Sequence, residues 1–297
     1  MARSWRIGVA ALCLAGALLL AKSVRVANES AGPCVVAAGP ARLGDLPEAS
    51  GLAIGRRTPG IIWSHNDSGN AEVLYALDAS GHMRGRVRVP VRMRDWEDVS
   101  AARCEAPRPA SGQAGACLYI ADIGDNGLAR RRVQIYRVAE PAPSDAETVP
   151  PEVFQATYAD GRHNAEAMFV IGTEMFIVTR DRTAGVYRAA RADDDPHAVV
   201  FQRIGELGLE AVTDAEATPD ERSVVVRTSG EVLLYRTADL IQGGRRAPYR
   251  RISIAGLREV QGEGVALDNN GTLYLASEGR PWSRAGTFMT LRCKLEK

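Results

Sequence analysis

Residues 94–100 read RDWEDVS, and this short stretch places three carboxylates and a tryptophan directly before an apolar run. A row of acids is typical of a solvated turn, whereas the apolar residues that follow predict a buried strand. The same arrangement recurs along the chain, so the stretch belongs to a repeat. The other members begin with ASGLAIG at 49–55, NAEAMFVIG at 164–172, VTDAEATPD at 212–220 and QGEGVALD at 261–268.

One polar residue near the start of each member defines an anchor position. The anchors are Ser50, Glu97, Glu166, Asp214 and Glu263. Their spacings are 47, 69, 48 and 49 residues. Short apolar strands separated by Gly, Asp, Asn and Pro turns fill the intervals, and helical periodicity is nearly absent. Units of about 40–50 residues with about four strands predict an all-β fold, a β-propeller of four-stranded blades.

Five blades are favoured by the five anchors, and six remain possible because one interval is long. That interval contains the loop 104–117 and the Pro-rich stretch 140–152, which both read as surface insertions. The last unit ends without a fourth strand. We therefore expect the orphan strand at 34–43 to complete the last blade and close the ring, which leaves no sheet edge open. A single domain over residues 34–297 follows.

The N-terminal residues 1–23 predict a secretory signal peptide. Arg3 and Arg6 precede the apolar run Ile7–Ala21, and small residues then supply a cleavage site. An uncleaved N-terminal anchor is the alternative. Either way we expect an exported protein, periplasmic or extracellular, with no membrane span once the signal is removed. The net charge of +1 gives no electrostatic case for nucleic acid as a partner.

Four cysteines remain after the signal, and in an exported chain they predict two disulfides with three possible pairings. The closure hypothesis favours one of these pairings. Cys34 and Cys293 lie on the proposed neighbouring strands, and Cys104 and Cys117 would then pair across the hairpin loop of the second unit.

Propeller topology gathers the polar loops of all units at one mouth of the central channel, because first strands start there and second strands end there. The expected metal ligands are the carboxylates Glu97, Asp122, Glu166, Asp214 and Glu263. The expected ligand-binding residues are His65, Asp67, Asp95, Asp98, Asp125, Asn126 and Glu278. The expected catalytic residues, if the protein is an enzyme, are His163, Arg180 and Arg227.

Converging carboxylates repel one another unless something positive compensates them. A hard cation such as Ca²⁺ fits oxygen ligands of this kind, and neutralisation by arginines is the alternative. Turn-forming Asp and Asn residues explain the same loops without any ligand, and the anchors would then hydrogen-bond neighbouring backbone amides. Trp63 and Trp96 are interpreted as packing between blades.

The motifs WSHNDSG, LDASG, DWEDVS, LYIADIGDN, IYRVAEP, HNAEAM and SEG occur in an order that resembles a group of exported bacterial β-propellers, over Ala49 to Gly279. The chain is also distantly similar to phytase-like and gluconolactonase-like propellers. That resemblance implies acidic residues around Ca²⁺ on the axis and hydrolysis of phosphate esters or lactones, and such relatives are typically six-bladed.

Two functions are therefore expected. The first is an exported propeller whose acidic face binds a small anionic ligand, an ion or an envelope protein without catalysis. The alternative is a Ca²⁺-dependent hydrolase of a phosphate ester or a related anionic small molecule, in which the metal would activate a water. The chain has no nucleophile-elbow, phosphate-loop or dinucleotide motif, and no complete catalytic set can be read from it.

Overall fold

The computed structural model describes residues 34–104, 115–191, 195, 197–279 and 285–294, and the regular secondary structure of this part of the chain is almost entirely β-strand. The expected signal segment 1–23 lies outside the described residues. Among the described residues, no helix is long and apolar enough to cross a membrane.

Three antiparallel sheets have four strands each. The first contains β2 (Ala49–Ile54), β3 (Ile62–Asn66), β4 (Val73–Leu77) and β5 (Met83–Arg88). The second contains β14 (Val212–Ala217), β15 (Ser223–Thr228), β16 (Glu231–Arg236) and β17 (Tyr249–Ser253), with α1 (Thr237–Gly243) and η1 (Gly244–Arg246) before β17 and η2 (Ala255–Leu257) after it. The third contains β18 (Gln261–Leu267), β19 (Thr272–Glu278), β20 (Gly286–Cys293) and β1 (Cys34–Leu43).

The fourth sheet has eight strands and departs from the expectation that each unit forms a separate sheet. One antiparallel half contains β6 (Trp96–Arg103), β7 (Ala116–Asp122), β8 (Val133–Ala139) and β9 (Glu152–Tyr158). The other contains β10 (Ala165–Ile171), β11 (Glu174–Thr179), β12 (Gly185–Arg191) and β13 (Ala198–Glu206). The outer strands β9 and β13 pair in parallel and join the halves. This pairing satisfies backbone groups that two open sheet edges would expose.

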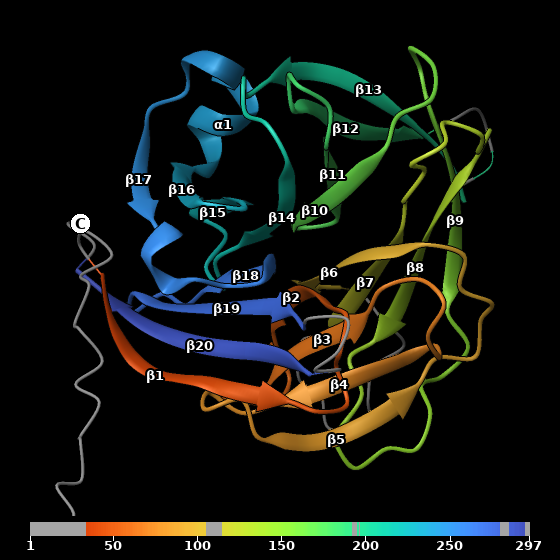
Figure 1. Ribbon diagram of the computed structural model, residues 1–297. Coiled ribbons are helices and arrows are strands. Elements are labelled where there is room, and N and C mark those ends of the chain that lie inside the picture. Colours follow the sequence, from red (N-terminus) through yellow and green to blue (C-terminus); the bar gives the residue numbers. More distant parts are fainter. Residues whose placement is uncertain (1–33, 105–114, 192–194, 196, 280–284, 295–297) are drawn as a thin grey trace, which may run out of the picture.

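The sheets lie around a common centre, with β2, β6, β10, β14 and β18 nearest to it (Figure 1). Each of these inner strands contacts the next one along the chain, and β18 contacts β2. Their residues are almost completely buried, because both faces of each strand are covered by neighbouring sheets. The start of every inner strand is thereby brought to the same region of the molecule.

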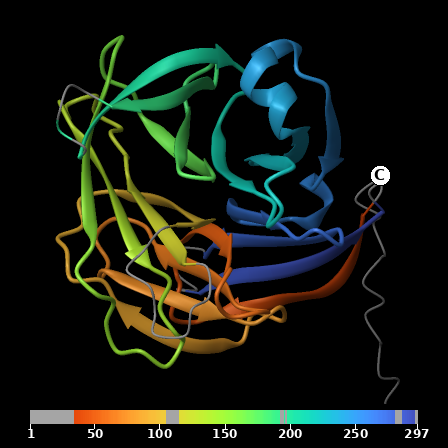
Figure 2. The same ribbon diagram turned by 180° about the vertical axis from the view of Figure 1, so that it is seen from behind.

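The N-terminal strand β1 pairs antiparallel with the C-terminal strand β20, and the view from behind shows the two side by side (Figure 2). Cys34 is the register partner of Cys293, and the two form a disulfide. A second disulfide joins Cys104 to Cys117 between β6 and β7. The two disulfides predicted from the sequence are therefore present, and the first joins strand β1 to strand β20.

Trp63 and Trp96 are fully buried and belong to one apolar cluster, which lies between the first sheet and strands β6–β8. Trp96 also lies edge-on against the ring of His65 at 5.7 Å. Packing between sheets, the interpretation made from the sequence, is thus what both tryptophans do.

Candidate functional site

A β-bulge near the start of each inner strand sets the positions of the anchors. In β6 the register shifts between Trp96 and Asp98, so Glu97 is the extra residue. The same shift makes Glu166 and Glu263 the extra residues of β10 and β18. In β14, however, the extra residue is Thr213. The sequence alignment was one residue out in this unit, and Asp214 matches Asp98 instead of Glu97. In β2 the register shifts between Ser50 and Ala53, and Ser50 itself pairs with His65, so this anchor is not the extra residue either.

Glu97, Glu166 and Glu263 form the centre of an acidic group at this end of the inner strands, which we call the mouth. Burial, followed by repulsion from Glu166, raises the pKa of Glu97 well above its ordinary value. Burial also raises the pKa of Glu166 to about 7 and that of Glu263 above its usual range. Glu278 joins this group, because burial and then the charge of Glu263 raise its pKa to about 7. These carboxyls therefore interact electrostatically with one another.

Three carboxylates at one side of the mouth are close enough to share a ligand. One oxygen each from Asp67, Asp95 and Glu97 lies within 4.8 Å of the others. Burial raises the pKa of Asp67 and of Asp95, and each also raises the pKa of Glu97 by repulsion. We refer to these residues as the Asp67–Asp95–Glu97 triad. Asp67 directly follows β3 of the first sheet, Asp95 directly precedes β6, and Glu97 lies in β6.

Arg180, which follows β11, reaches the mouth from the third unit. Its guanidinium forms an ion pair with Glu166 and is also attracted by Glu263 and Glu97. Among the ion pairs of the described residues, this is the one that involves a mouth carboxylate. A single arginine therefore offsets only part of the negative charge of these carboxylates. The remaining negative charge would attract a cation.

The raised pKa values predict how the stability of the protein depends on pH. A carboxyl whose pKa is higher in the folded than in the unfolded state stabilises the fold below its unfolded pKa, and this contribution is lost as the pH rises through the folded pKa. Glu166 and Glu278, each with a pKa of about 7, place that loss between about pH 5 and about pH 8. We expect the melting temperature in chelator to fall across this window. A melting temperature that stays constant or rises, measured by calorimetry, would contradict the described electrostatics of the mouth.

Asp98 and Asp214 are both fully buried, and their carboxyls interact with each other. Asp98 accepts hydrogen bonds from the backbone N–H groups of Val99 and Met168, both at 2.6 Å. Asp214 accepts one from the N–H of Val265. Each carboxyl thus links its own inner strand to the next, and burial raises the pKa of both groups. We correct the expected roles accordingly: these two carboxyls hold neighbouring strands in register.

Asp122 and Asp125, which the sequence suggested as ligands, are occupied by contacts within the protein. Asp122 accepts hydrogen bonds from the N–H groups of Arg94 and Asp95 and pairs with the buried Arg130 at 2.7 Å. Asp125 accepts from the N–H groups of Ala129 and Arg130 at 2.8 and 2.9 Å, which fixes the turn after β7. Both carboxylates shape the loop beside the mouth, so we place them outside the candidate metal site.

Arg227 and His65 also lie in positions that differ from their expected roles. Arg227 is fully buried, donates to the carbonyls of Gly264 and Ala276, and pairs with Glu259 at 2.5 Å. It fastens β15 to the neighbouring sheet and has no exposed surface for a substrate. His65 is likewise fully buried, and burial lowers its pKa to about 4. Its imidazole is therefore neutral at physiological pH and inaccessible to a ligand.

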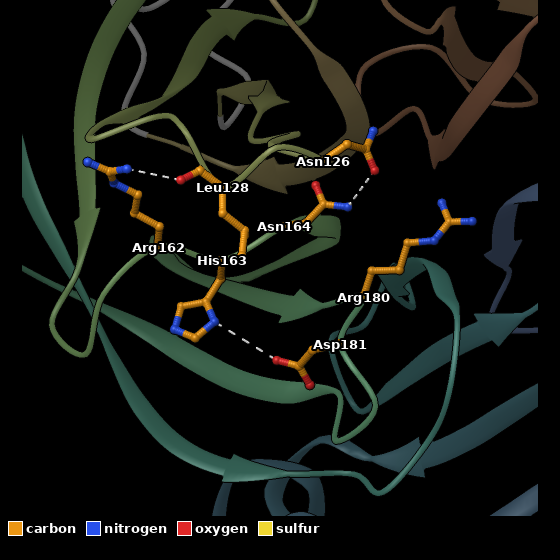
Figure 3. Close-up of a pocket in the computed structure, with 7 residues that line it drawn as sticks. All are labelled: Asn126, Leu128, Arg162, His163, Asn164, Arg180 and Asp181. Atoms are coloured by element: carbon orange, nitrogen blue, oxygen red, sulfur yellow. Dashed lines mark hydrogen bonds and ion pairs between the residues drawn. The ribbon is translucent and has the colours of Figure 1, made fainter.

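A pocket of about 380 Å³ opens beside the mouth. Its lining residues are Asn126, Leu128, Arg162, His163, Asn164, Arg180 and Asp181 (Figure 3). The Nε2 atom of His163 is 2.9 Å from Asp160 Oδ1 and 2.9 Å from the hydroxyl of Tyr187, so the ring is held in place. The structure thus brings three predicted residues, Asn126, His163 and Arg180, to one pocket.

Arg56 is a half-buried residue whose role could not be read from the sequence. It follows β2 at the end opposite the mouth, and its guanidinium donates to the carbonyls of Ala101, Ala217 and Thr218. It thereby connects three inner strands, and the charge of Glu216 attracts it. An arginine pair in a hairpin turn carries no signal that would distinguish it from a surface turn.

No protein-family model and no curated protein matches this chain. Among solved structures, the soluble aldose sugar dehydrogenase from Escherichia coli matches with a TM-score of 0.50 at 9% identity, over 88% of this chain and 99% of that one. The major allergen Mala s 1 of Malassezia sympodialis matches with a TM-score of 0.50 at 10% identity, over 85% and 94% of the two chains. At these identities the likeness concerns the fold alone, and it supports a β-propeller-type fold.

Proposed function

We propose that the mouth binds a divalent cation, Ca²⁺ in the first instance, and that the protein uses this acidic face for ligand binding. The observation that carries the proposal is the Asp67–Asp95–Glu97 triad, whose oxygens lie within 4.8 Å of one another. Carboxylate oxygens are the ligands that Ca²⁺ prefers, and the triad contains no histidine or cysteine that would favour zinc. The further carboxyls Glu166, Glu263 and Glu278 add negative charge around it.

The proposed architecture is a ring of five four-stranded blades. The eight-stranded sheet is then two blades whose outer strands have paired, and the three four-stranded sheets supply the rest. Strand β1 completes the fifth blade by pairing with β20, and the Cys34–Cys293 disulfide locks this closure. The contacts of β18 with β2 and of β2 with β6 support the count.

Export is supported by the two disulfides, since such bonds persist in oxidising compartments. Residues 1–23 would direct export, either as a cleaved signal peptide or as an N-terminal anchor. A periplasmic or extracellular protein encounters free Ca²⁺ at concentrations that suit a modest-affinity site of extracellular type. The ligand or envelope partner of the mouth would then meet the protein outside the cytosol.

Hydrolysis of an anionic small molecule is the second candidate function. It is favoured by Glu166, whose pKa of about 7 lies in the range of an efficient general base. The double change Glu97→Gln with Glu166→Gln separates the two candidates. Lost turnover with an undiminished melting temperature supports catalysis, whereas unchanged turnover of phosphate-ester and lactone substrates removes these side chains from any mechanism.

Elemental analysis and chelation test the proposal directly. The exported protein, purified without chelator, is expected to contain about one Ca²⁺ per chain, and EDTA is expected to lower its melting temperature. Adding Ca²⁺ should restore the melting temperature, and Mg²⁺ should do so less well because it loses its water shell reluctantly. A melting curve that EDTA leaves unmoved, with no metal in the analysis, would overturn the proposal.

Gly124 offers a steric test of the same site. A Cβ atom at this position would collide with the carboxylates of Glu97 and Asp95, whereas one at Gly127 would meet nothing within 4 Å. We expect Gly124→Ala to spread the triad and weaken Ca²⁺ binding about tenfold, the effect of a disturbed ligand geometry. Gly127→Ala, three residues along the same loop, is the matched control and should bind Ca²⁺ like the wild type. If titration calorimetry gives Gly124→Ala and Gly127→Ala the same affinity for Ca²⁺, the cation does not bind at the triad.

A further inference from the structure

The pocket beside the mouth has the size and the donors of a small-ligand site. Its volume of about 380 Å³ falls within the range of small-molecule pockets. Two arginines, Arg162 and Arg180, come from loops on either side of it, and the aromatic ring of His163 forms part of its wall. Asp181 is the one carboxylate among the described lining residues. Thr179 and Thr183 donate hydrogen bonds to it, which reduces its capacity to repel an anion.

Several donors of the pocket are not used by the protein. Asn164 donates to Asn126 Oδ1 at 3.1 Å, and within the described part of the chain the amide NH₂ of Asn126 has no partner. Arg162 is exposed, and its one side-chain hydrogen bond to the described residues runs from Nη1 to the carbonyl of Leu128 at 3.0 Å. The amide NH₂ of Asn126 and the guanidinium of Arg162 are hydrogen-bond donors and cannot accept hydrogen bonds. The pocket therefore suits a group of oxygen acceptors with negative charge.

Arg180 belongs to both the pocket and the mouth. Figure 3 shows its side chain extending away from His163 and Asp181, and its guanidinium pairs with Glu166. Its other guanidinium N–H groups have no partner among the described residues. A cation bound at the mouth competes with Arg180 for the same negative charge, since Arg180 is also attracted by Glu97 and Glu263. Such a cation would leave Arg180 free to turn toward the pocket.

We propose that this pocket is an oxyanion subsite, in which Arg162, Arg180 and the Asn126 amide bind the carboxylate or phosphate group of a small ligand. Guanidinium groups recognise both kinds of oxyanion through charge-assisted, often bidentate hydrogen bonds. The coupling to Ca²⁺ rests on the proposed function, whereas the anion subsite itself does not. Because coupling between two sites is reciprocal, the anion must tighten Ca²⁺ binding by the same factor by which Ca²⁺ tightens anion binding.

Calorimetric titrations with acetate and methylphosphonate test the subsite. These probes separate a carboxylate preference from a phosphate preference, and neither precipitates Ca²⁺. We expect binding in EDTA, tightened at least about fivefold by Ca²⁺, the lower end of typical coupling. Arg162→Gln and Arg180→Gln should each weaken binding about tenfold, the effect of losing one charge-assisted hydrogen bond. Arg188→Gln is the matched control, because Arg188 forms an exposed ion pair with Glu174 in the same half of the sheet.

Arg180→Gln gives the diagnostic result. It should weaken anion binding and at the same time strengthen Ca²⁺ binding, since it removes a positive charge that competes for Glu166. Absence of binding by either probe, or binding that Arg162→Gln and Arg180→Gln leave unchanged, overturns the subsite. If the probes bind through both arginines in EDTA but Ca²⁺ fails to bind, the subsite is supported and the proposed cation function alone is overturned.

Discussion

Replacing Glu97 by glutamine is expected to weaken Ca²⁺ binding by about a hundredfold and to raise the melting temperature of the chelator-treated protein. The first effect follows because Glu97 supplies one of three clustered carboxylates. The second follows because the pKa of Glu97 lies well above its ordinary value. At neutral pH the folded protein must either bury the charged carboxylate or bind a proton there, and each costs free energy of folding. A neutral glutamine removes both costs.

Asp122→Asn is the matched control for this prediction, since Asp122 belongs to the same sheet and lies close to the mouth. Its carboxylate pairs with buried Arg130, so the change should lower the melting temperature with or without Ca²⁺. If the melting temperature rises for Glu97→Gln and falls for Asp122→Asn, the carboxylate of Glu97 serves binding and that of Asp122 serves the fold. A lower melting temperature for Glu97→Gln in EDTA would show that Glu97 serves the fold as well.

Replacing Arg56 by methionine is expected to reduce the free energy of unfolding by about 2–3 kcal/mol. The guanidinium of Arg56 donates to the carbonyls of Ala101, Ala217 and Thr218, and these carbonyls would lose a half-buried donor. The carboxyl of Glu216, which attracts Arg56, would lose a compensating charge. Methionine keeps much of the side-chain volume and also the backbone N–H that donates to Glu140. Urea unfolding measures the change.

Arg57→Met provides the control in the adjacent position. Arg57 is exposed, and its guanidinium makes a single hydrogen bond to the described part of the chain, to the carbonyl of Glu140 at 2.9 Å. An exposed change of this kind should alter the free energy of unfolding by no more than about 0.5 kcal/mol. If Arg56→Met and Arg57→Met have equally small effects, Arg56 does not hold the inner strands together.

The repeat could be read from the sequence because its strands and anchors recur at a similar spacing. Glu97, Glu166 and Glu263 occupy equivalent positions, and the two disulfides follow from where the cysteines lie in the repeat. The error at Asp214 has a physical cause, because a bulge inserts a residue without any signal in the sequence. A shift of one residue moves a side chain from the mouth to the buried tier beneath it.

Other features depend on contacts between distant segments and could not be predicted. The parallel pairing of β9 with β13 joins outer strands of different units, and a repeat pattern contains no information about it. Arg227 and Arg56 are arginines of ordinary sequence context whose buried carbonyl partners lie far along the chain. Burial, which decides whether an arginine binds a ligand or the protein itself, becomes visible only in three dimensions.

Calorimetric titration of Ca²⁺ into the chelator-stripped protein, in two buffers of different ionisation enthalpy, tests the central claim most directly. We predict binding of about one Ca²⁺ per chain with release of protons, because carboxyls with raised pKa values must lose their protons to coordinate the metal. Glu97→Gln should abolish most of the binding, whereas the exposed control Glu174→Gln should not. Absence of binding to the wild type, or undiminished binding to Glu97→Gln, would contradict the assignment of the mouth as a cation site.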